Sequence, residues 1–274
     1  MRENTVEVLK IRFDKTTLKK ATEKAINLAK GEKQSYITTP NPEILLKSLE
    51  NPEFAKILNN SDLNIPDGIG ILWATKYLDI IKNTKSKNIK RAKWLYSLIA
   101  QLVYPKYIKS ILKERVTGVD LMEKICKHAP ENNLKIFLLG AKKGTAEKVK
   151  EILEKKYQGI QIVGTFSGSP RVEEEKDITD RIKQSQAQIL FVAYGAPKQE
   201  LWIARNLHKM PQVKLAVGIG GSFNFIARIL KRAPGFMQKL GLEWLYRLFQ
   251  EPSRIGRIYN ATIKFSLTIL RKSF

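Results

Sequence analysis

The chain has 274 residues, 43% of them hydrophobic, and its 49 lysines and arginines outnumber its 26 aspartates and glutamates, giving a formal net charge of +23. Length and composition exclude a disordered chain, the single cysteine, Cys126, excludes an internal disulfide framework, and two histidines leave little material for a histidine-rich metal site. The positive charge indicates an anionic partner: nucleic acid, an acidic membrane surface or a phosphorylated substrate.

The first 78 residues alternate between short apolar strands and amphipathic helices. Residues 1–10 carry mixed charge and lack the apolar core of a signal peptide. Thr16 or Thr17 is placed to cap the first helix, and Pro42 fits the first turn of the second. We predict strands at residues 6–13, 35–39 and 62–65, and helices at residues 16–30, 43–49, 51–59 and 69–78.

Residues 79–115 are set apart by charge, with ten lysines and arginines against two acidic residues. A basic stretch, residues 82–93, precedes an aromatic and aliphatic run, Trp94–Tyr104, whose 11 residues fall short of the roughly 20 that a spanning helix needs. Two interpretations of residues 79–113 stay open. One is a helical hairpin packed on the core with a solvated basic face. The other is an amphipathic segment at a membrane interface, with lysines facing lipid phosphates.

From Val116 the alternation becomes regular, which is typical of parallel βαβ units. We predict strands at residues 135–139, 161–166, 189–193 and 214–217, and helices at residues 120–129, 146–157, 173–184 and 201–208. Residues 228–274 are helical by pattern and again basic, with ten lysines and arginines and two glutamates. The predicted fold class is α/β: a Rossmann-like, mostly parallel sheet flanked by helices, with a basic helical insertion and a C-terminal helical appendage.

Candidate chemistry lies in the loops that follow the strands, where open parallel sheets bind ligands. Asp67, between Pro66 and Gly68, is either a turn or helix-capping residue or a general base at the mouth of the sheet. Gly140–Thr145 and Gly218–Ser222 place glycines before helices, where backbone amides can approach a phosphate, and a purely structural reason for each is equally open. Neither loop matches the P-loop or the dinucleotide-binding fingerprint.

No motif typical of a metal site occurs, and an Asp-x-Asp pair is also absent, so neutralisation of a diphosphate is expected to fall to arginine. Arg254 and Arg257 form an i, i+3 pair on one helix face, and Arg247 precedes them by about two turns. These arginines are either solvated charges of the tail or a clamp for a diphosphate.

A series of short motifs over nearly the whole chain resembles the WecG/TagA/CpsF glycosyltransferases. The motifs are Thr38–Glu43, Pro66–Gly70, Arg115–Asp120, Phe137–Gly140, Gly195–Glu200, Gly220–Phe223, Arg232–Pro234 and Gly241–Arg247. The resemblance implies an inverting, metal-independent transferase that needs no cofactor. It implies a UDP-sugar donor and, as acceptor, a sugar on a polyprenyl diphosphate at the cytoplasmic face of the plasma membrane.

Within that family we expect transfer of N-acetylmannosamine from its UDP derivative to the 4-hydroxyl of lipid-linked N-acetylglucosamine, for teichoic acid or a related cell-surface polysaccharide. The uronic acid of N-acetylmannosamine or a hexose is the alternative donor. The resemblance also implies residue roles, with Asp67 as general base, Thr39 as a pocket residue and Gln199 as a substrate-positioning residue in the catalytic group. The expected substrate-binding residues are Asn41, Arg115, Gly140, Gly195, Lys198, Gly220, Gly221, Arg247, Arg254 and Arg257.

By the same resemblance residues 1–227 form the catalytic core, with residues 79–113 as the insertion, and residues 228–274 form a membrane-associating appendage. The insertion is longer than the family core needs, and homo-oligomerisation stays open. A nucleic-acid-binding protein is the competing class, because of the charge. Lysines interleaved with aliphatic rows favour a lipid interface over a nucleic acid, so we expect a protein located in the cytoplasm and peripheral on the inner face of the membrane.

Overall fold

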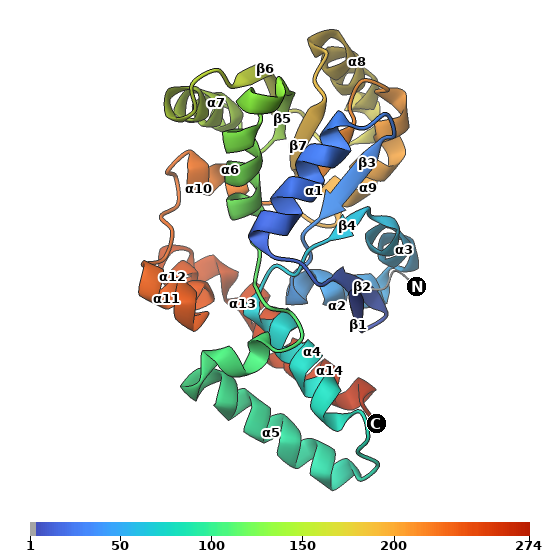
Figure 1. Cartoon of the computed structure of the whole chain (residues 1–274), viewed down its shortest axis with the longest axis vertical. Coiled ribbons are helices and arrows are strands. Elements are labelled where there is room, and N and C mark those ends of the chain that lie inside the picture. Colours follow the sequence, from blue (N-terminus) through green and yellow to red (C-terminus); the bar gives the residue numbers. More distant parts are fainter. Residues whose placement is uncertain (1–3) are drawn as a thin grey trace.

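The computed structural model describes residues 4–274, apart from the side chains of Leu102 and Lys239. Over these residues the strands form a six-stranded parallel sheet in the order β4-β3-β8-β7-β5-β6, and a separate hairpin (Figure 1). The strands of the large sheet are β3 (Ser35–Thr38), β4 (Leu63–Asn64), β5 (Lys135–Gly140), β6 (Gln161–Phe166), β7 (Ile189–Ala193) and β8 (Leu215–Gly218). This arrangement confirms the predicted α/β class with a Rossmann-like parallel sheet.

Helices cover both faces of this sheet, which explains why its central strands are almost continuously apolar. In β7, Ile189 and Phe191 belong to one apolar cluster, whereas Leu190 and Val192 belong to a second, because successive side chains point to opposite faces. The first face is covered by α1 (Leu18–Lys30), α6 (Gly118–His128), α7 (Thr145–Lys156) and α10 (Ser222–Ile226). The second face is covered by α8 (Glu175–Ser185) and α9 (Lys198–Asn206).

The prediction of a single strand at residues 6–13 was wrong. The segment is a hairpin of two antiparallel strands, β1 (Thr5–Val8) and β2 (Ile11–Asp14). Leu9 and Lys10 form its turn, with φ values of 51° and 64°. Positive φ at both central residues is the geometry of the tightest hairpin turns, which usually contain asparagine or glycine. With neither residue present, the sequence carried no signal for the reversal.

A group of helices extends from the carboxyl edge of the sheet and forms the lower part of the molecule in Figure 1. It contains α4 (Ile69–Ile81), α5 (Lys87–Val103), the 3₁₀ turn η1 (Pro105–Lys109) and α14 (Phe265–Lys272), and we call it the helical lobe. Its interior buries Trp73, Tyr77, Phe265 and Ile269 in one cluster with the hairpin, α2 (Pro42–Glu50) and α3 (Pro52–Asn60). The basic stretch from Lys87 onward and the aromatic run up to Val103 form one continuous helix, α5, which packs on α4.

The C-terminal stretch divides between two places. Residues 235–259 contain α11 (Gly235–Leu240), α12 (Glu243–Gln250) and α13 (Ile255–Tyr259), and we call them the arm. A π-helical turn, Asn260–Lys264, then leads into α14, whose residues Phe265 and Ile269 are buried in the helical lobe. None of the helices in the described part of the chain combines the length and the apolar character needed to cross a bilayer.

Candidate active site

The loops after β3, β4 and β8 are tied together at the carboxyl edge of the sheet. Thr39, which follows β3, is buried, and its hydroxyl donates to the carbonyl of Gly218 at the end of β8, at 3.2 Å. Asp67, which follows β4, donates its backbone N–H to the carbonyl of Pro40 at 3.1 Å. Parallel strands end at the same edge, so residues far apart in the sequence meet here.

Asp67 lies between β4 and α4, and its carboxylate does not cap the helix. Gly68 is the N-cap residue of α4 and makes no side-chain capping bond. The Asp67 carboxylate instead accepts a hydrogen bond from the backbone N–H of Gly118, at the start of α6. Burial raises the pKa of Asp67 to about 6, the positive charge of Arg115 opposes this rise, and the negative charge of Glu243 adds to it. A carboxyl group with this pKa can take up or release a proton near neutral pH.

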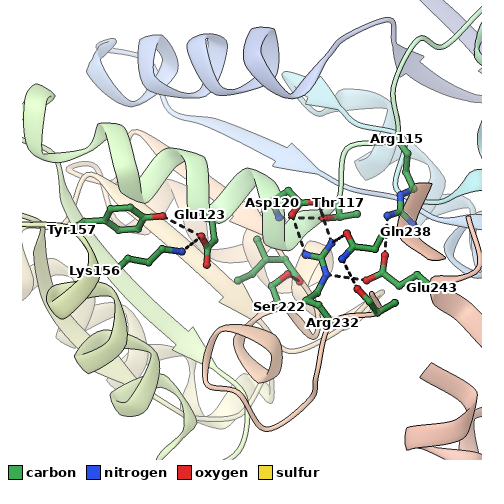
Figure 2. Close-up of polar contacts among 12 residues, drawn as sticks. Arg115, Thr117, Asp120, Glu123, Lys156, Tyr157, Ser222, Arg232, Gln238 and Glu243 are labelled. Carbon is green, nitrogen blue, oxygen red and sulfur yellow. Dashed lines mark hydrogen bonds and ion pairs between the residues drawn. The ribbon is translucent and has the colours of Figure 1, made fainter. Parts of the chain in front are cut away.

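Arg115 and Glu243, whose charges act on Asp67, belong to a chain of ion pairs. Figure 2 shows these pairs. Arg115 Nη2 lies 2.8 Å from Glu243 Oε2, and Arg232 Nε lies 3.0 Å from Glu243 Oε1. Arg232 Nη1 also pairs with Asp120 Oδ1 at 3.0 Å. Because Glu243 begins α12 and Asp120 lies in the first turn of α6, the network joins the arm to the core at the candidate base.

Arg247 of the arm lies over the loop that follows β8, and a carboxylate connects it to a second arginine of the arm, Arg254. A Cβ added at Gly221 would lie 3.2 Å from Nη2 of Arg247, and the Arg247 guanidinium stacks over the ring of Phe225 with 5.0 Å between its Cζ and the ring centroid. Glu251 bridges Arg247 and Arg254, at 3.3 and 3.0 Å. Both cations therefore share one carboxylate close to a glycine loop.

Arg257 joins this group from α13. Burial and the neighbouring charges of Arg247 and Arg257 lower the pKa of Arg254, so the three guanidinium groups lie close to one another. Arg257 Nη2 pairs with Glu43 Oε2 at 2.8 Å, which brings it to the first turn of α2. Asn41 caps that helix, because its Oδ1 accepts from the N–H of Ile44 at 3.0 Å.

Gln199 is buried behind two of the glycine loops. Its Oε1 accepts from the backbone N–H of Gly195 at 3.1 Å and from that of Gly220 at 2.9 Å. Its Nε2 donates to Oε1 of Glu200 at 2.8 Å, and burial raises the pKa of Glu200 to about 7. These bonds fix the loops after β7 and β8 relative to each other. Gln199 therefore has the geometry of a residue that acts through the backbone it holds.

Two of the predicted binding residues, Gly140 and Lys198, have surroundings other than the three arginines of the arm. Gly140 has a φ of +102°, and a Cβ there would lie 2.9 Å from the backbone carbon of Ala193, so its position requires glycine for the close approach of β5 and β7. Lys198 is exposed at the start of α9 and lines a separate hollow with Arg171 and Arg205. The structure gives the packing of the strands as the reason for Gly140.

The sequence interpretation gave no role to four residues that surround Asp67: Gly118, Asp120, Arg232 and Glu243. Each lies within a motif that carried the family resemblance, so the signal was present. The missing information was the orientation of the side chains. A motif does not show which of its charged side chains point toward a carboxylate elsewhere in the chain. Among residues 4–274, no group of three or more histidine, cysteine, aspartate or glutamate side chains is arranged to hold a metal ion.

A family model described as the glycosyl transferase WecG/TagA/CpsF family matches residues 6–107 and 100–274. Curated relatives named N-acetylglucosaminyldiphosphoundecaprenol N-acetyl-beta-D-mannosaminyltransferase are similar over most of the chain. The one from Bacillus spizizenii strain W23 is 31% identical over 226 residues, which cover 82% of this chain and 75% of the relative. The one from Bacillus subtilis strain 168 is 29% identical, covering 87% and 80% of the two chains. The one from Staphylococcus aureus strain MW2 is 29% identical, covering 96% and 92%.

Proposed function

Because this chain belongs to the WecG/TagA/CpsF family of glycosyl transferases, we propose that it transfers N-acetylmannosamine from UDP-N-acetylmannosamine to the 4-hydroxyl of N-acetylglucosamine on a polyprenyl diphosphate. The names of the relatives support both sugars and the lipid-diphosphate acceptor. The product would serve teichoic acid or a related cell-surface polysaccharide. The enzyme would work at the inner face of the plasma membrane, where it meets a water-soluble nucleotide sugar and a lipid-anchored acceptor.

Asp67 is the general base in this proposal. Its carboxylate takes the proton of the acceptor hydroxyl while that oxygen attacks C1 of the donor sugar from the face opposite the departing diphosphate, which inverts the configuration. The raised pKa supports the role, since a carboxylate near pKa 6 is a stronger base than an ordinary aspartate and is still ionised at neutral pH. The Gly118 N–H holds the carboxylate in place.

Charge on the leaving UDP is neutralised by arginine, without a metal ion. Arg247, Arg254 and Arg257 form the cluster for this task, and Glu251 now lies between the first two of them. An arriving diphosphate would compete for the donors that this carboxylate occupies, and guanidinium groups bind phosphate oxygens in pairs. Backbone amides of the Gly220–Gly221 loop, fixed by Gln199, would supply further donors. Thr39 and Asn41 would line the sugar pocket, and Arg115 would position the acceptor beside the base.

The observation that carries this proposal is the meeting of a carboxyl group of raised pKa, Asp67, with the arm that bears the arginines, through Glu243. The test is a donor screen with purified protein and a short-chain lipid-diphosphate N-acetylglucosamine acceptor, with the product linkage read by NMR. We expect a β-linked N-acetylmannosamine and release of UDP without added divalent ion, at an unchanged rate in EDTA. Transfer from another UDP-sugar alone would show that the proposed donor is wrong. Absence of any transfer would refute the proposal.

A further inference from the structure

The outward face of α5 exposes large apolar side chains to solvent. It consists of five residues of the helix and its C-cap residue, each between 51 and 79% exposed: Ile89, Leu95, Tyr96, Ile99, Val103 and Tyr104. Figure 1 shows α5 at the end of the molecule farthest from α7 and α8, at the tip of the helical lobe. A contiguous exposed apolar surface on a folded protein marks a site of interaction.

The inward side of α5 carries polar side chains, and Ser97, Lys90 and Lys93 each have a hydrogen-bond partner in the helical lobe. Ser97 is fully buried and accepts from Nε1 of Trp73 at 3.0 Å. The amino groups of Lys90 and Lys93 donate to the carbonyls of Ser273 and Ile80, at 2.5 and 2.9 Å. A helix on the surface of a water-soluble protein normally turns its apolar side inward and its lysines outward. In α5 this distribution is partly reversed: Trp94 and Leu98 pack inward and Tyr96 contacts the ring of Tyr107, but the other apolar side chains of the outward face stay exposed.

Positive charge flanks the outward face at both ends. Residues 80–113 contain nine lysines and arginines and no aspartate or glutamate. Seven of the nine are exposed, four before or within the first turns of α5 and three after its end: Lys82, Lys85, Lys87, Arg91, Lys106, Lys109 and Lys113. An apolar strip with basic residues at its ends complements a bilayer whose headgroups are anionic.

We propose that the outward face of α5 docks on the surface of an anionic lipid bilayer, with the helix lying in the plane of the interface. The choice of a bilayer rests in part on the proposed function, because a polyprenyl-linked acceptor lies in a membrane. Tyr96 and Tyr104 enter the headgroup level, which suits aromatic rings with a polar tip, and Ile99 and Val103 reach the acyl boundary. The exposed lysines neutralise lipid phosphates.

A second copy of this chain is the other partner that could cover the outward face of α5. A symmetric dimer through the outward face would bring the same surface patch from two chains together. That contact would place two sets of exposed lysines and arginines close to each other, with no carboxylate from residues 80–113 to offset them. Charge therefore favours a lipid surface over self-association.

The test uses the full-length protein and extruded vesicles of phosphatidylcholine with 30% phosphatidylglycerol, measured by co-sedimentation. We compare the unchanged chain with Leu95→Ser/Ile99→Ser, and we use Leu49→Ser/Val172→Ser as the matched control. Leu49 and Val172 are also exposed apolar residues, but they lie on other elements. We expect the α5 double variant to bind at least about tenfold more weakly and the control to bind as the unchanged chain does. Equal binding by both double variants would overturn the proposal.

A second measurement places the helix directly. Cys126, the single cysteine of the chain, is fully buried, so a thiol-reactive, polarity-sensitive dye can be attached at Ile99→Cys or, as control, at Val172→Cys. We expect a blue shift on anionic vesicles at position 99 and none at 172. Binding should fall with salt and be weak on pure phosphatidylcholine. A chain that is a dimer without lipid, and becomes a monomer on Leu95→Ser/Ile99→Ser, would assign the face to a second copy instead. These assays need no substrate, so a failed transfer reaction leaves their result intact.

Discussion

At the scale of single residues, the proposed role of Asp67 as a base comes with a cost in stability. Its pKa is raised to about 6, from 3.8 for a free aspartate, because burial disfavours the charged form. Between about pH 4 and pH 6 the native protein holds a proton that the unfolded chain has already released, so stability falls as pH rises through this window. Above pH 6 the cost is complete, and it amounts to at most roughly 3 kcal/mol at about 1.36 kcal/mol per pKa unit.

We therefore expect Asp67→Asn to lose activity and gain stability together. The transferase rate should fall by about 10²–10⁴-fold, the usual contribution of a general base. The free energy of unfolding should rise at pH 7 and approach that of the unchanged protein near pH 4, because the variant has no charge to bury. Denaturant titration at the two pH values and initial-rate assays measure both effects. A full-rate variant would remove Asp67 from its role.

Glu243 should tune the base from the arm. The negative charge of Glu243 raises the pKa of Asp67 directly. The positive charge of Arg115 lowers this pKa, and Glu243 weakens that effect because it pairs with Arg115. Glu243→Gln removes both influences, so the pKa of Asp67 should fall and the acidic limb of the pH profile of kcat/KM should move to lower pH. Glu123→Gln is the control, since Glu123 lies on the same helix as Asp120 but pairs with Lys156. An unmoved limb in Glu243→Gln, or an equal move in both variants, would contradict the coupling.

Gln199 is expected to act through the loops that it holds. Gln199→Leu keeps the volume but leaves the N–H groups of Gly195 and Gly220 without their acceptor, which should cost about 1–3 kcal/mol of stability. It should also raise KM for the donor more than it lowers kcat. Gln188→Leu is the control, because Gln188 accepts from the N–H of Lys135 at the opposite edge of the sheet. That variant should lose stability and keep donor KM, and equal KM values in both would argue against loop positioning.

At the scale of elements, α14 is the part of the C-terminal stretch that belongs to the helical lobe. Phe265 is fully buried against α4 and its neighbours, although the sequence groups it with the basic tail. We expect Phe265→Ala to cost about 3–5 kcal/mol in the free energy of unfolding, the usual cost of emptying a buried aromatic site. Phe249→Ala, at a strongly exposed position of α12, should change it by no more than about 0.5 kcal/mol. Equal values from denaturant titration would show that α14 is not part of this core.

Several elements were predictable because their determinants are local. The bounds of β6 and β7 match the prediction, and α1 begins after Thr17, whose side chain caps it. A period of two or of 3.6 residues, a capping hydroxyl and a proline in a first turn are all visible along the chain. The hairpin at residues 5–14 was missed because its turn uses leucine and lysine in a conformation that neither residue favours.

At the scale of the whole molecule, the helical lobe would link the candidate site to the membrane surface on which we propose that the acceptor lies. α4 begins two residues after Asp67 and packs on α5, so the candidate base adjoins the group of helices that carries the outward face. Docking through α5 would hold the carboxyl edge of the sheet at a fixed distance from the bilayer. The enzyme would then meet a lipid-anchored sugar without extracting it from the membrane.

This arrangement predicts a difference between two forms of the acceptor. With the acceptor embedded in anionic vesicles, Leu95→Ser/Ile99→Ser should lower the rate at least about tenfold, because less enzyme is at the surface. With a water-soluble short-chain acceptor the same variant should match the unchanged protein. The pair of initial-rate assays checks this, and a rate that falls equally on both acceptors would indicate damage to the site instead of lost docking.

The sequence by itself determined the α/β class, the parallel sheet and, through its ordered motifs, the family. These depend on periodicity, turn residues and short motifs, which act over a few neighbouring positions. Only the tertiary structure decided that Asp67 bonds to Gly118 and not to its own helix, that Gln199 points into two loops, and that α5 turns apolar side chains outward. Each of these depends on contacts between residues distant along the chain, or on which side of a helix meets a neighbour, and packing sets both after the local elements have formed.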